Sequence, residues 1–209
     1  MSTLIAIPVR GTMPSKTRLA PLFDEEQRAI LVRSMLEHML SQMPVGTDVA
    51  VITRSPEFLL DLSPTVEVIE QAFAYAGLNG SLQQALNHAS KFDYKELLML
   101  PGDLPLLAEH EVTSLLLEEG RMVLVGDRDH EGTNGLRLPT AWADEFEFAM
   151  GLHSFAHHIA EAQRLGTVPV TVYHRGLAHD LDTPDDWLAL PENVRECLSE
   201  RMQMAAKGA

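Results

Sequence analysis

The chain has 209 residues, of which 45% are hydrophobic and 22% are charged, and its formal net charge is −14 at pH 7. This length and composition predict one globular domain over residues 1–209, with a frayed tail at residues 205–209. The negative charge argues against non-specific binding to nucleic acid or to an anionic membrane, because both reward positive surface. We expect a cytoplasmic protein, since no membrane span or signal peptide is recognised and the single Cys197 fits a reducing compartment.

The first expected strand is the apolar run at residues 4–7, and a basic loop follows it. Arg10, Lys16 and Arg18 lie close together in this loop, and a helix is expected to begin after it with Asp24 as its N-cap. A strand, a basic loop and a helix in this order are a common phosphate site in α/β proteins. An ordinary solvated loop is the alternative, but the basic cluster runs against the acidic composition of the chain.

Strands and helices alternate along the rest of the chain. The expected strands cover residues 48–53, 66–69, 96–100, 121–125, 136–138 and 168–173. The expected helices cover residues 24–43, 81–90, 109–119, 153–165 and the C-terminus, with a short helical or irregular piece at 56–62 and a loop at 77–80. Such alternation predicts a doubly wound α/β sheet whose ligands bind at the carboxyl ends of the strands.

Carboxylates that could bind a metal ion occur at two places in the chain. Asp103 comes after the apolar strand 96–100 and a Pro-Gly turn, which would present it at the carboxyl end of that strand. Capping of the next turn is an equally good explanation of Asp103. Asp180 and Asp182 stand two apart in an extended segment, so both can point to one side and converge on one cation. Mg²⁺ would suit such ligands together with phosphate oxygens and water.

Two later segments are candidates for anion contacts. Residues 131–135, Glu-Gly-Thr-Asn-Gly, would let the backbone approach a phosphate or carboxylate closely, although a plain turn is a strong alternative. Ser154 stands at the start of an expected helix, where its hydroxyl and the free N–H groups could contact an anion. His153, His157 and His158 of this helix are assigned to its polar face rather than to zinc, since no cysteine or His-Glu-x-x-His pattern accompanies them.

Several common catalytic signatures are absent from the sequence. It has no Gly-x-Ser-x-Gly elbow, no Walker A loop and no Gly-x-Gly-x-x-Gly fingerprint. These absences lower the case for a serine hydrolase, a P-loop ATPase and a dinucleotide-dependent oxidoreductase.

The order of the motifs resembles one family, the guanylyltransferases of coenzyme F420 biosynthesis that act on 2-phospho-L-lactate, phosphoenolpyruvate or 3-phospho-D-glycerate. The motifs that carry the resemblance are Ile7-Pro-Val with Lys16-Thr-Arg18-Leu19, Gly77-Leu-Asn79, Leu100-Pro-Gly-Asp103-Leu-Pro-Leu-Leu107, Gly132-Thr-Asn134, Gly151-x-x-Ser154-Phe155 and Asp180-Leu-Asp182-Thr-Pro-Asp185-Asp186. The resemblance implies a single-domain nucleotidyltransferase fold of the glycosyltransferase-A kind, with a mixed, mostly parallel central sheet flanked by helices.

The resemblance also implies a reaction, in which the phosphate of a three-carbon acid attacks the α-phosphate of GTP and releases pyrophosphate, with Mg²⁺ as the cofactor. The implied residues are Arg10, Lys16, Arg18, Leu78 and Asn79 for the nucleotide, Lys16, Arg18 and Asp103 for catalysis, Thr133, Gly151 and Ser154 for the acceptor acid, and Asp103, Asp180 and Asp182 for the metal. The expected partners are therefore GTP and a small phospho-acid. The acceptor and the oligomeric state stay open, with a homodimer as one option.

Two other functions remain open at this point. One is a related nucleotidyltransferase with another acceptor, such as a molybdenum-cofactor guanylyltransferase or a cytidylyltransferase. Those enzymes typically begin with a Gly-Gly-x-Ser-x-Arg-like loop, whereas this chain has Arg-Gly-Thr-Met-Pro-Ser-Lys at residues 10–16. The other is a non-catalytic nucleotide-binding module, which would have no need for Asp103 together with Asp180 and Asp182.

Overall fold

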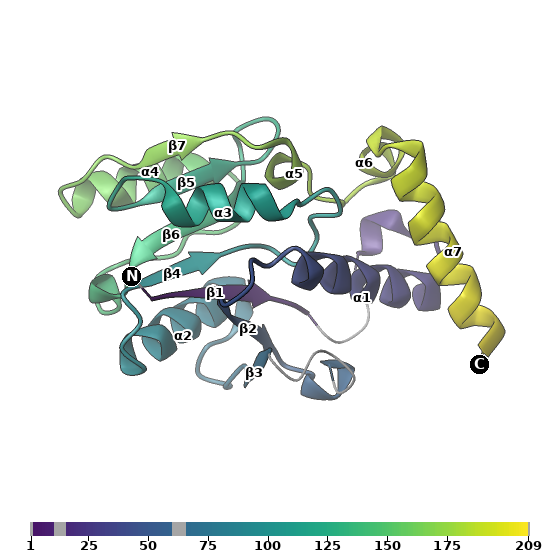
Figure 1. Ribbon diagram of the computed structural model, residues 1–209, viewed down its shortest axis with the longest axis horizontal. Coiled ribbons are helices and arrows are strands. Elements are labelled where there is room, and N and C mark those ends of the chain that lie inside the picture. The colour runs from purple at the N-terminus through teal and green to yellow at the C-terminus, as the bar shows by residue number, and fades with distance from the viewer. Residues whose placement is uncertain (1, 11–15, 60–65, 209) are drawn as a thin grey trace.

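The computed structural model describes residues 2–10, 16–59 and 66–208, which form a seven-stranded sheet with helices on both faces (Figure 1). The strand order is β3-β2-β1-β4-β6-β5-β7. Residues 11–15 of the basic loop and residues 60–62 of the expected helical or irregular piece lie outside the described residues.

The strands coincide with the apolar runs of the sequence. They are β1 Thr3–Pro8, β2 Asp48–Thr53, β3 Glu67–Glu70, β4 Glu96–Met99, β5 Val123–Gly126, β6 Thr133–Pro139 and β7 Val170–Val172. β6 pairs antiparallel with β4 and β5, and the other neighbouring strands of the described sheet are parallel. The prediction of a mixed, mostly parallel α/β sheet is therefore confirmed.

The helices alternate with these strands and cover both faces of the sheet. They are α1 Glu25–Ser41, α2 Gly77–Lys91, α3 Glu109–Leu117, α4 Ser154–Arg164, α5 Arg175–Ala178, α6 Pro184–Ala189 and α7 Glu192–Gly208. The start of α1 is fixed as predicted, because Asp24 accepts from the backbone N–H of Gln27 and the Gln27 side chain accepts from that of Asp24. None of the described helices is both long and apolar enough to cross a membrane.

Two buried apolar clusters fill the space between the sheet and its helices. Side chains from α1, α3 and α7 form one cluster, and side chains from α2 and α4 form the other. β1 contributes to both, with Ile5 and Ile7 on the first side and Leu4 and Ala6 on the second. Because helices cover both faces, this strand shows no polar alternation. In Figure 1, α7 lies beside α1 at the edge of the first layer.

One helix boundary differs from the sequence expectation. Residues 77–80 were expected to form a loop, but they are the first turn of α2. Gly77 has a φ of +77°, a left-handed conformation that glycine adopts without a steric penalty, and it joins the turn before it to the helix. The hydroxyl of Ser81 donates to the carbonyl of Leu78 at 2.7 Å and closes this first turn.

The antiparallel strand β6 also begins earlier than expected, at Thr133 rather than at residue 136. The side chain of Asp127 explains the difference, because it binds the backbone of the turn between β5 and β6. Its carboxylate accepts from the N–H groups of Asp129, Glu131 and Gly132. This tight turn allows β5 and β6 to pair as far as Thr133, so the motif expected as a glycine-bearing loop is partly strand.

Candidate active site

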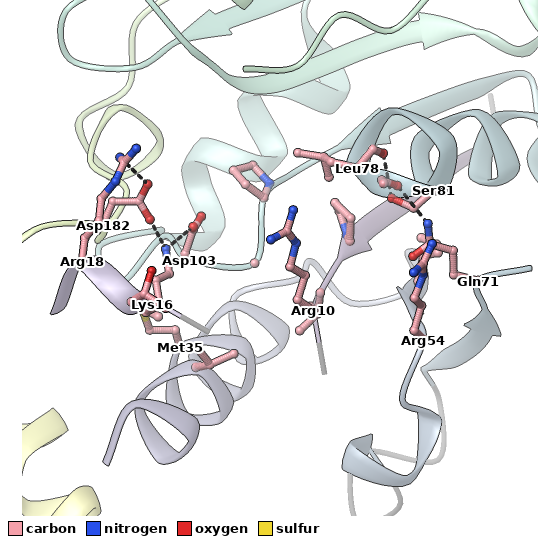
Figure 2. Close-up of a pocket in the computed structure, with 18 residues that line it drawn as sticks. Arg10, Lys16, Arg18, Met35, Arg54, Gln71, Leu78, Ser81, Asp103 and Asp182 are labelled. Carbon is pink, nitrogen blue, oxygen red and sulfur yellow. Dashed lines mark hydrogen bonds and ion pairs between the residues drawn. The ribbon is translucent and has the colours of Figure 1, made fainter. Parts of the chain in front are cut away.

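A cavity of about 590 Å³ lies at the carboxyl ends of β1, β2, β3 and β4 (Figure 2). This is the edge at which a doubly wound sheet binds its ligands. Several predicted site residues line the cavity, namely Arg10, Lys16, Arg18, Leu78, Asp103 and Asp182. Asn79, Thr133, Gly151, Ser154 and Asp180 are not among its lining residues.

Lys16 makes the central ionic contacts of this cavity. Its Nζ lies 2.5 Å from Oδ2 of Asp103 and 2.5 Å from Oδ1 of Asp182. Burial alone would lower the pKa of Lys16, but the two carboxylates outweigh it and raise the pKa to about 12. Lys16 is therefore a charged ammonium group at neutral pH, held between two segments that are far from it in sequence.

The cavity is elongated, and its charged groups lie at different places along it. Figure 2 shows Lys16 and Arg18 at one end, Arg54 and Gln71 at the other, and Arg10 between them. Arg18 lies 3.8 Å from Asp182 and its side chain is 74% exposed, so this ion pair contributes little to stability. Arg18 is consequently available to contact an anion that enters the cavity.

The backbone brings Asp103 and Asp182 together. The N–H of Leu181 donates to the carbonyl oxygen of Asp103 at 3.1 Å and fixes the two segments side by side. Gly102 allows the same segment to approach the end of β1, because a Cβ at this position would stand 2.9 Å from Cγ2 of Val9. A side chain at position 102 would therefore force Val9 or the turn before Asp103 to shift.

Asp180 is the third predicted metal ligand, and its side chain is bound to β6. The amide of Asn134 donates to Oδ1 of Asp180 at 3.1 Å. Burial raises the pKa of Asp180, the carboxylates of Asp103 and Asp182 raise it further, and the Asn134 hydrogen bond opposes them. The three carboxylates thus lie close enough to repel one another, as groups that share a cation would.

The chemistry of this donor set suits a hard divalent cation. Oδ1 of Asp103 is buried and has no hydrogen-bond partner among the described residues, so a cation would satisfy it. The described residues nevertheless contain no preformed group of three metal-ligating side chains. Lys16 pairs instead with one oxygen of Asp103 and one of Asp182. In this structure the ammonium group neutralises the carboxylates that were expected to bind Mg²⁺.

The residues expected to hold the acceptor gather around the start of α4. Ser154 is its first residue, and its N–H donates to the carbonyl of Gly151 at 3.1 Å. Gly151 has a φ of +119°, which side-chain-bearing residues rarely adopt. Thr133 reaches α4 from β6 through a contact of 2.9 Å between its hydroxyl and Nδ1 of His158. The structure therefore places all three predicted acceptor residues together.

A β-bulge turns Thr133 and Asn134 toward their partners. The pairing of β5 with β6 shifts register at this point, where Val125 faces Gly135 but Gly126 faces Thr133. Strict alternation from Gly135 would direct Thr133 to the α3 face, yet Thr133 contacts α4. The bulge reverses the alternation, as bulges beside active sites commonly do.

Asn79 was expected near the nucleoside, and the structure shows what its side chain binds. Its Oδ1 accepts from the N–H of Met150 at 2.8 Å. Asn79 lies in the first turn of α2, beside the cavity-lining Leu78. It therefore connects the helix that borders the cavity with the segment that leads to Gly151.

Three residues of interest were missed in the sequence. Arg54 follows β2 and Gln71 follows β3 directly, so the strand-end rule that identified Asp103 could have found both. His158 was assigned to a polar helix face, but it is 0% exposed and packed against Phe146. No local pattern distinguishes it from the exposed His157, because only the packing of α4 decides which histidine is covered.

Comparison with solved structures identifies the fold. A nucleotidyl transferase from Methanothermobacter thermautotrophicus superimposes with a TM-score of 0.61 at 14% identity, over 95% of this chain and 97% of that chain. A structure from Desulfovibrio desulfuricans G20 superimposes with a TM-score of 0.75 at 16% identity, over 98% of both chains. The sheet and its helices therefore have a nucleotidyltransferase fold.

Comparison with sequences identifies the family. Residues 3–191 match the family described as "Guanylyl transferase CofC like", and the chain belongs to this family. It is 32% identical to the phosphoenolpyruvate guanylyltransferase of Sphaerobacter thermophilus, covering 89% of this chain and 91% of that protein. It is 31% identical to the 3-phospho-D-glycerate guanylyltransferase of Phenylobacterium zucineum (86% and 85%) and 29% identical to the 2-phospho-L-lactate guanylyltransferase of Methanothermobacter thermautotrophicus (89% and 82%).

His158 gives the stability of the protein a specific dependence on pH. Burial lowers the pKa of His158 from its ordinary 6.5 to about 4, with a further decrease from His157 and a small opposing effect of Glu161. The unfolded chain takes up this proton as the pH falls below about 6.5, whereas the folded chain takes it up only near pH 4. The contribution of His158 to the free energy of unfolding is therefore complete above about pH 6.5 and is lost progressively as the pH falls toward about 4.

We expect His158→Phe to lose less stability than the wild type between about pH 7 and about pH 5, by an amount on the order of 2 kcal/mol. Urea unfolding at the two pH values measures the difference. His110→Phe, which alters an exposed histidine, serves as the control and should retain the wild-type dependence. Equal pH dependence of wild type and His158→Phe would contradict the lowered pKa.

Proposed function

We propose that the protein is a guanylyltransferase that transfers GMP from GTP to the phosphate of a three-carbon phospho-acid and releases pyrophosphate, within coenzyme F420 biosynthesis in the cytoplasm. The observation that carries this proposal is the position of Lys16 between Asp103 and Asp182 in a strand-end cavity of an otherwise acidic protein. Membership of the family supports the reaction class, and the names of the relatives support the class of acceptor.

The reaction requires two anions to meet, so charge neutralisation and alignment are the main tasks of the site. Arg10, Lys16 and Arg18 supply positive charge along the cavity, where the triphosphate would lie. A phosphate acceptor is already ionised near neutral pH, so the reaction needs no general base. A covalent intermediate is equally unnecessary, because the acceptor phosphate itself attacks the α-phosphate.

Lys16 is the group expected to change partners during the reaction. An ammonium ion that contacts the triphosphate must leave at least one of its two carboxylates, Asp103 or Asp182. These carboxylates then lack a counter-charge and, with Asp180, would hold Mg²⁺, which neutralises charge on the phosphate oxygens. These contacts therefore favour a binding order in which Mg²⁺ enters together with the nucleotide rather than before it.

The far end of the cavity suits a guanine base. The amide N–H₂ of Gln71 donates to the carbonyls of Tyr75 and Gly77, which leaves its Oε1 as an acceptor. Guanine offers N–H donors on one edge and the acceptors O6 and N7 on the other, and arginine is the side chain that most often binds the second edge. At this end of the cavity, Arg54 could donate to the O6 and N7 edge, and Oε1 of Gln71 could accept from the N–H edge.

The first prediction concerns the reaction itself. We expect the protein to release pyrophosphate in the presence of Mg²⁺ when GTP is supplied with phosphoenolpyruvate, 3-phospho-D-glycerate or 2-phospho-L-lactate. A coupled pyrophosphate assay over these three acceptors and the four nucleoside triphosphates measures it. Nucleotide binding without release from any acceptor would instead favour a non-catalytic nucleotide-binding module.

The second prediction concerns the carboxylates. Asp182→Asn should lower turnover by about 100-fold or more, because it removes charge that stabilises the transition state through the metal. It should leave the fold intact, and binding of Mn²⁺ in the presence of GTP should weaken in parallel. Asp185→Asn is the matched control, since Asp185 is exposed in the first turn of α6 and should not affect either measurement. Near-normal turnover of Asp182→Asn would rule out the metal role.

The third prediction concerns the base. Arg54→Ala should raise the KM for GTP and reduce the preference for GTP over ATP by about 10-fold, the loss expected for one base contact. The ratio of kcat/KM for the two nucleotides measures this preference. Arg33→Ala, on α1 outside the cavity lining, is the control. A lower activity with an unchanged GTP/ATP ratio would show that Arg54 does not recognise the base.

A further inference from the structure

Two buried hydroxyl groups lie at the start of α4. Ser154 is 1% exposed, and its Oγ has no hydrogen-bond partner among the described residues. Thr133 is 3% exposed and reaches the same helix from β6. A buried hydroxyl without a partner is costly unless a ligand satisfies it, and a helix N-terminus favours an anionic ligand. The phospho-acid of the proposed reaction is such a ligand.

His158 stands four residues after Ser154, on the same face of α4, and its ring makes two contacts. Its Nδ1 lies 2.9 Å from the hydroxyl of Thr133, and its Nε2 lies 3.2 Å from the backbone nitrogen of Ala149. Thr133 belongs to β6, and Ala149 belongs to the segment that leads to Gly151. One buried ring thus joins both walls of the region assigned to the acceptor.

These contacts determine which ring nitrogen carries the proton. The backbone N–H of Ala149 can only donate, so Nε2 of His158 must present a lone pair. The proton of a neutral imidazole then lies on Nδ1 and is donated to the oxygen of Thr133. The hydroxyl oxygen is thereby used as an acceptor, and its own hydrogen remains available for another partner.

The segment 149–151 is held from two sides. His158 accepts from the N–H of Ala149, and Asn79 of α2 accepts from the N–H of Met150, the next residue. The chain then turns at Gly151 in a conformation with a φ of +119° and enters α4 at Ser154. The position of this turn relative to Thr133 therefore depends on the same imidazole ring.

We propose that His158 is a positioning residue of the acceptor subsite, which makes the Thr133 hydroxyl a hydrogen-bond donor to the phospho-acid and fixes the segment 149–151 beside it. The inference rests on the proposed function, because it takes the ligand at the start of α4 to be the acceptor. His158 acts through Thr133 and Ala149 and does not contact the acceptor. A protonated ring would lose the lone pair that holds Ala149, so the neutral form is required.

Kinetics of paired variants test this role. His158→Phe keeps a ring that packs against Phe146 but removes both hydrogen bonds. We expect the KM for phosphoenolpyruvate to rise by about 10-fold or more, the loss expected for a hydrogen bond to a charged group, with the KM for GTP within about 2-fold of wild type. Thr133→Val should raise the same KM, and the effect of the double variant should be smaller than the sum of the two single effects, because both variants lose the hydrogen bond from the Thr133 hydroxyl.

Thr133→Ser retains the hydroxyl and should restore most of the affinity for the acceptor, which a merely structural defect would not allow. His157→Phe changes the exposed neighbouring histidine and is the control on the same helix. Equal increases in the two KM values, or additive effects in the double variant, would overturn the proposal. Circular dichroism establishes that each variant is folded, and if His158→Phe does not fold, the tautomer of His158 in the unaltered protein still tests the proposal.

The tautomer can be measured on the unaltered protein. Nitrogen-15 NMR of the imidazole should show His158 neutral at about pH 7, with its proton on Nδ1. A proton on Nε2 would overturn the proposal whatever the activity of the enzyme. Calorimetric titration with phosphoenolpyruvate separates the two proposals. If the wild type binds phosphoenolpyruvate and reacts, and His158→Phe binds it equally well, only the role of His158 is refuted. If the wild type neither binds phosphoenolpyruvate nor reacts, both proposals are refuted.

Discussion

The ionic bridge from Lys16 to Asp103 and Asp182 is the contact on which the site depends. It joins the loop after β1, the turn after β4 and the segment before α6, which are distant in sequence and meet only at the edge of the sheet. Two carboxylates this close together would repel each other without a cation between them. In this structure, Lys16 supplies that cation. A bound triphosphate would also require a cationic group at this position.

The site has two parts that different helices border. α1 and α2 flank the cavity that holds the basic residues, and the residues assigned to the acceptor lie around the start of α4. Asn134 connects the two parts through Asp180, and Asn79 connects them through Met150. The β-bulge in β6 makes the first connection possible, because it directs Asn134 toward Asp180 while Thr133 faces α4. These hydrogen bonds therefore join the two parts of the site.

Much of the fold could be read from apolar runs and helix signals. The β1 and β4 runs are unbroken because helices cover both faces, and Asp24 with Gln27 marks the start of α1. The errors arose where a specific side-chain contact, and not the apolar pattern, decides the outcome. Asp127 tightens the hairpin before β6, and burial of His158 depends on how α4 packs. Periodicity within one segment contains no information about such contacts.

The sequence by itself determined the alternation of strands and helices, the basic loop, the carboxylates after strands and the resemblance to a family, because each is a local pattern of residue types. Only the tertiary structure decided how these groups combine. It paired Lys16 with two of the three expected metal ligands and turned Thr133 toward His158. Those outcomes depend on backbone register and on the packing of helices against the sheet, which bring together residues separated by many positions along the chain.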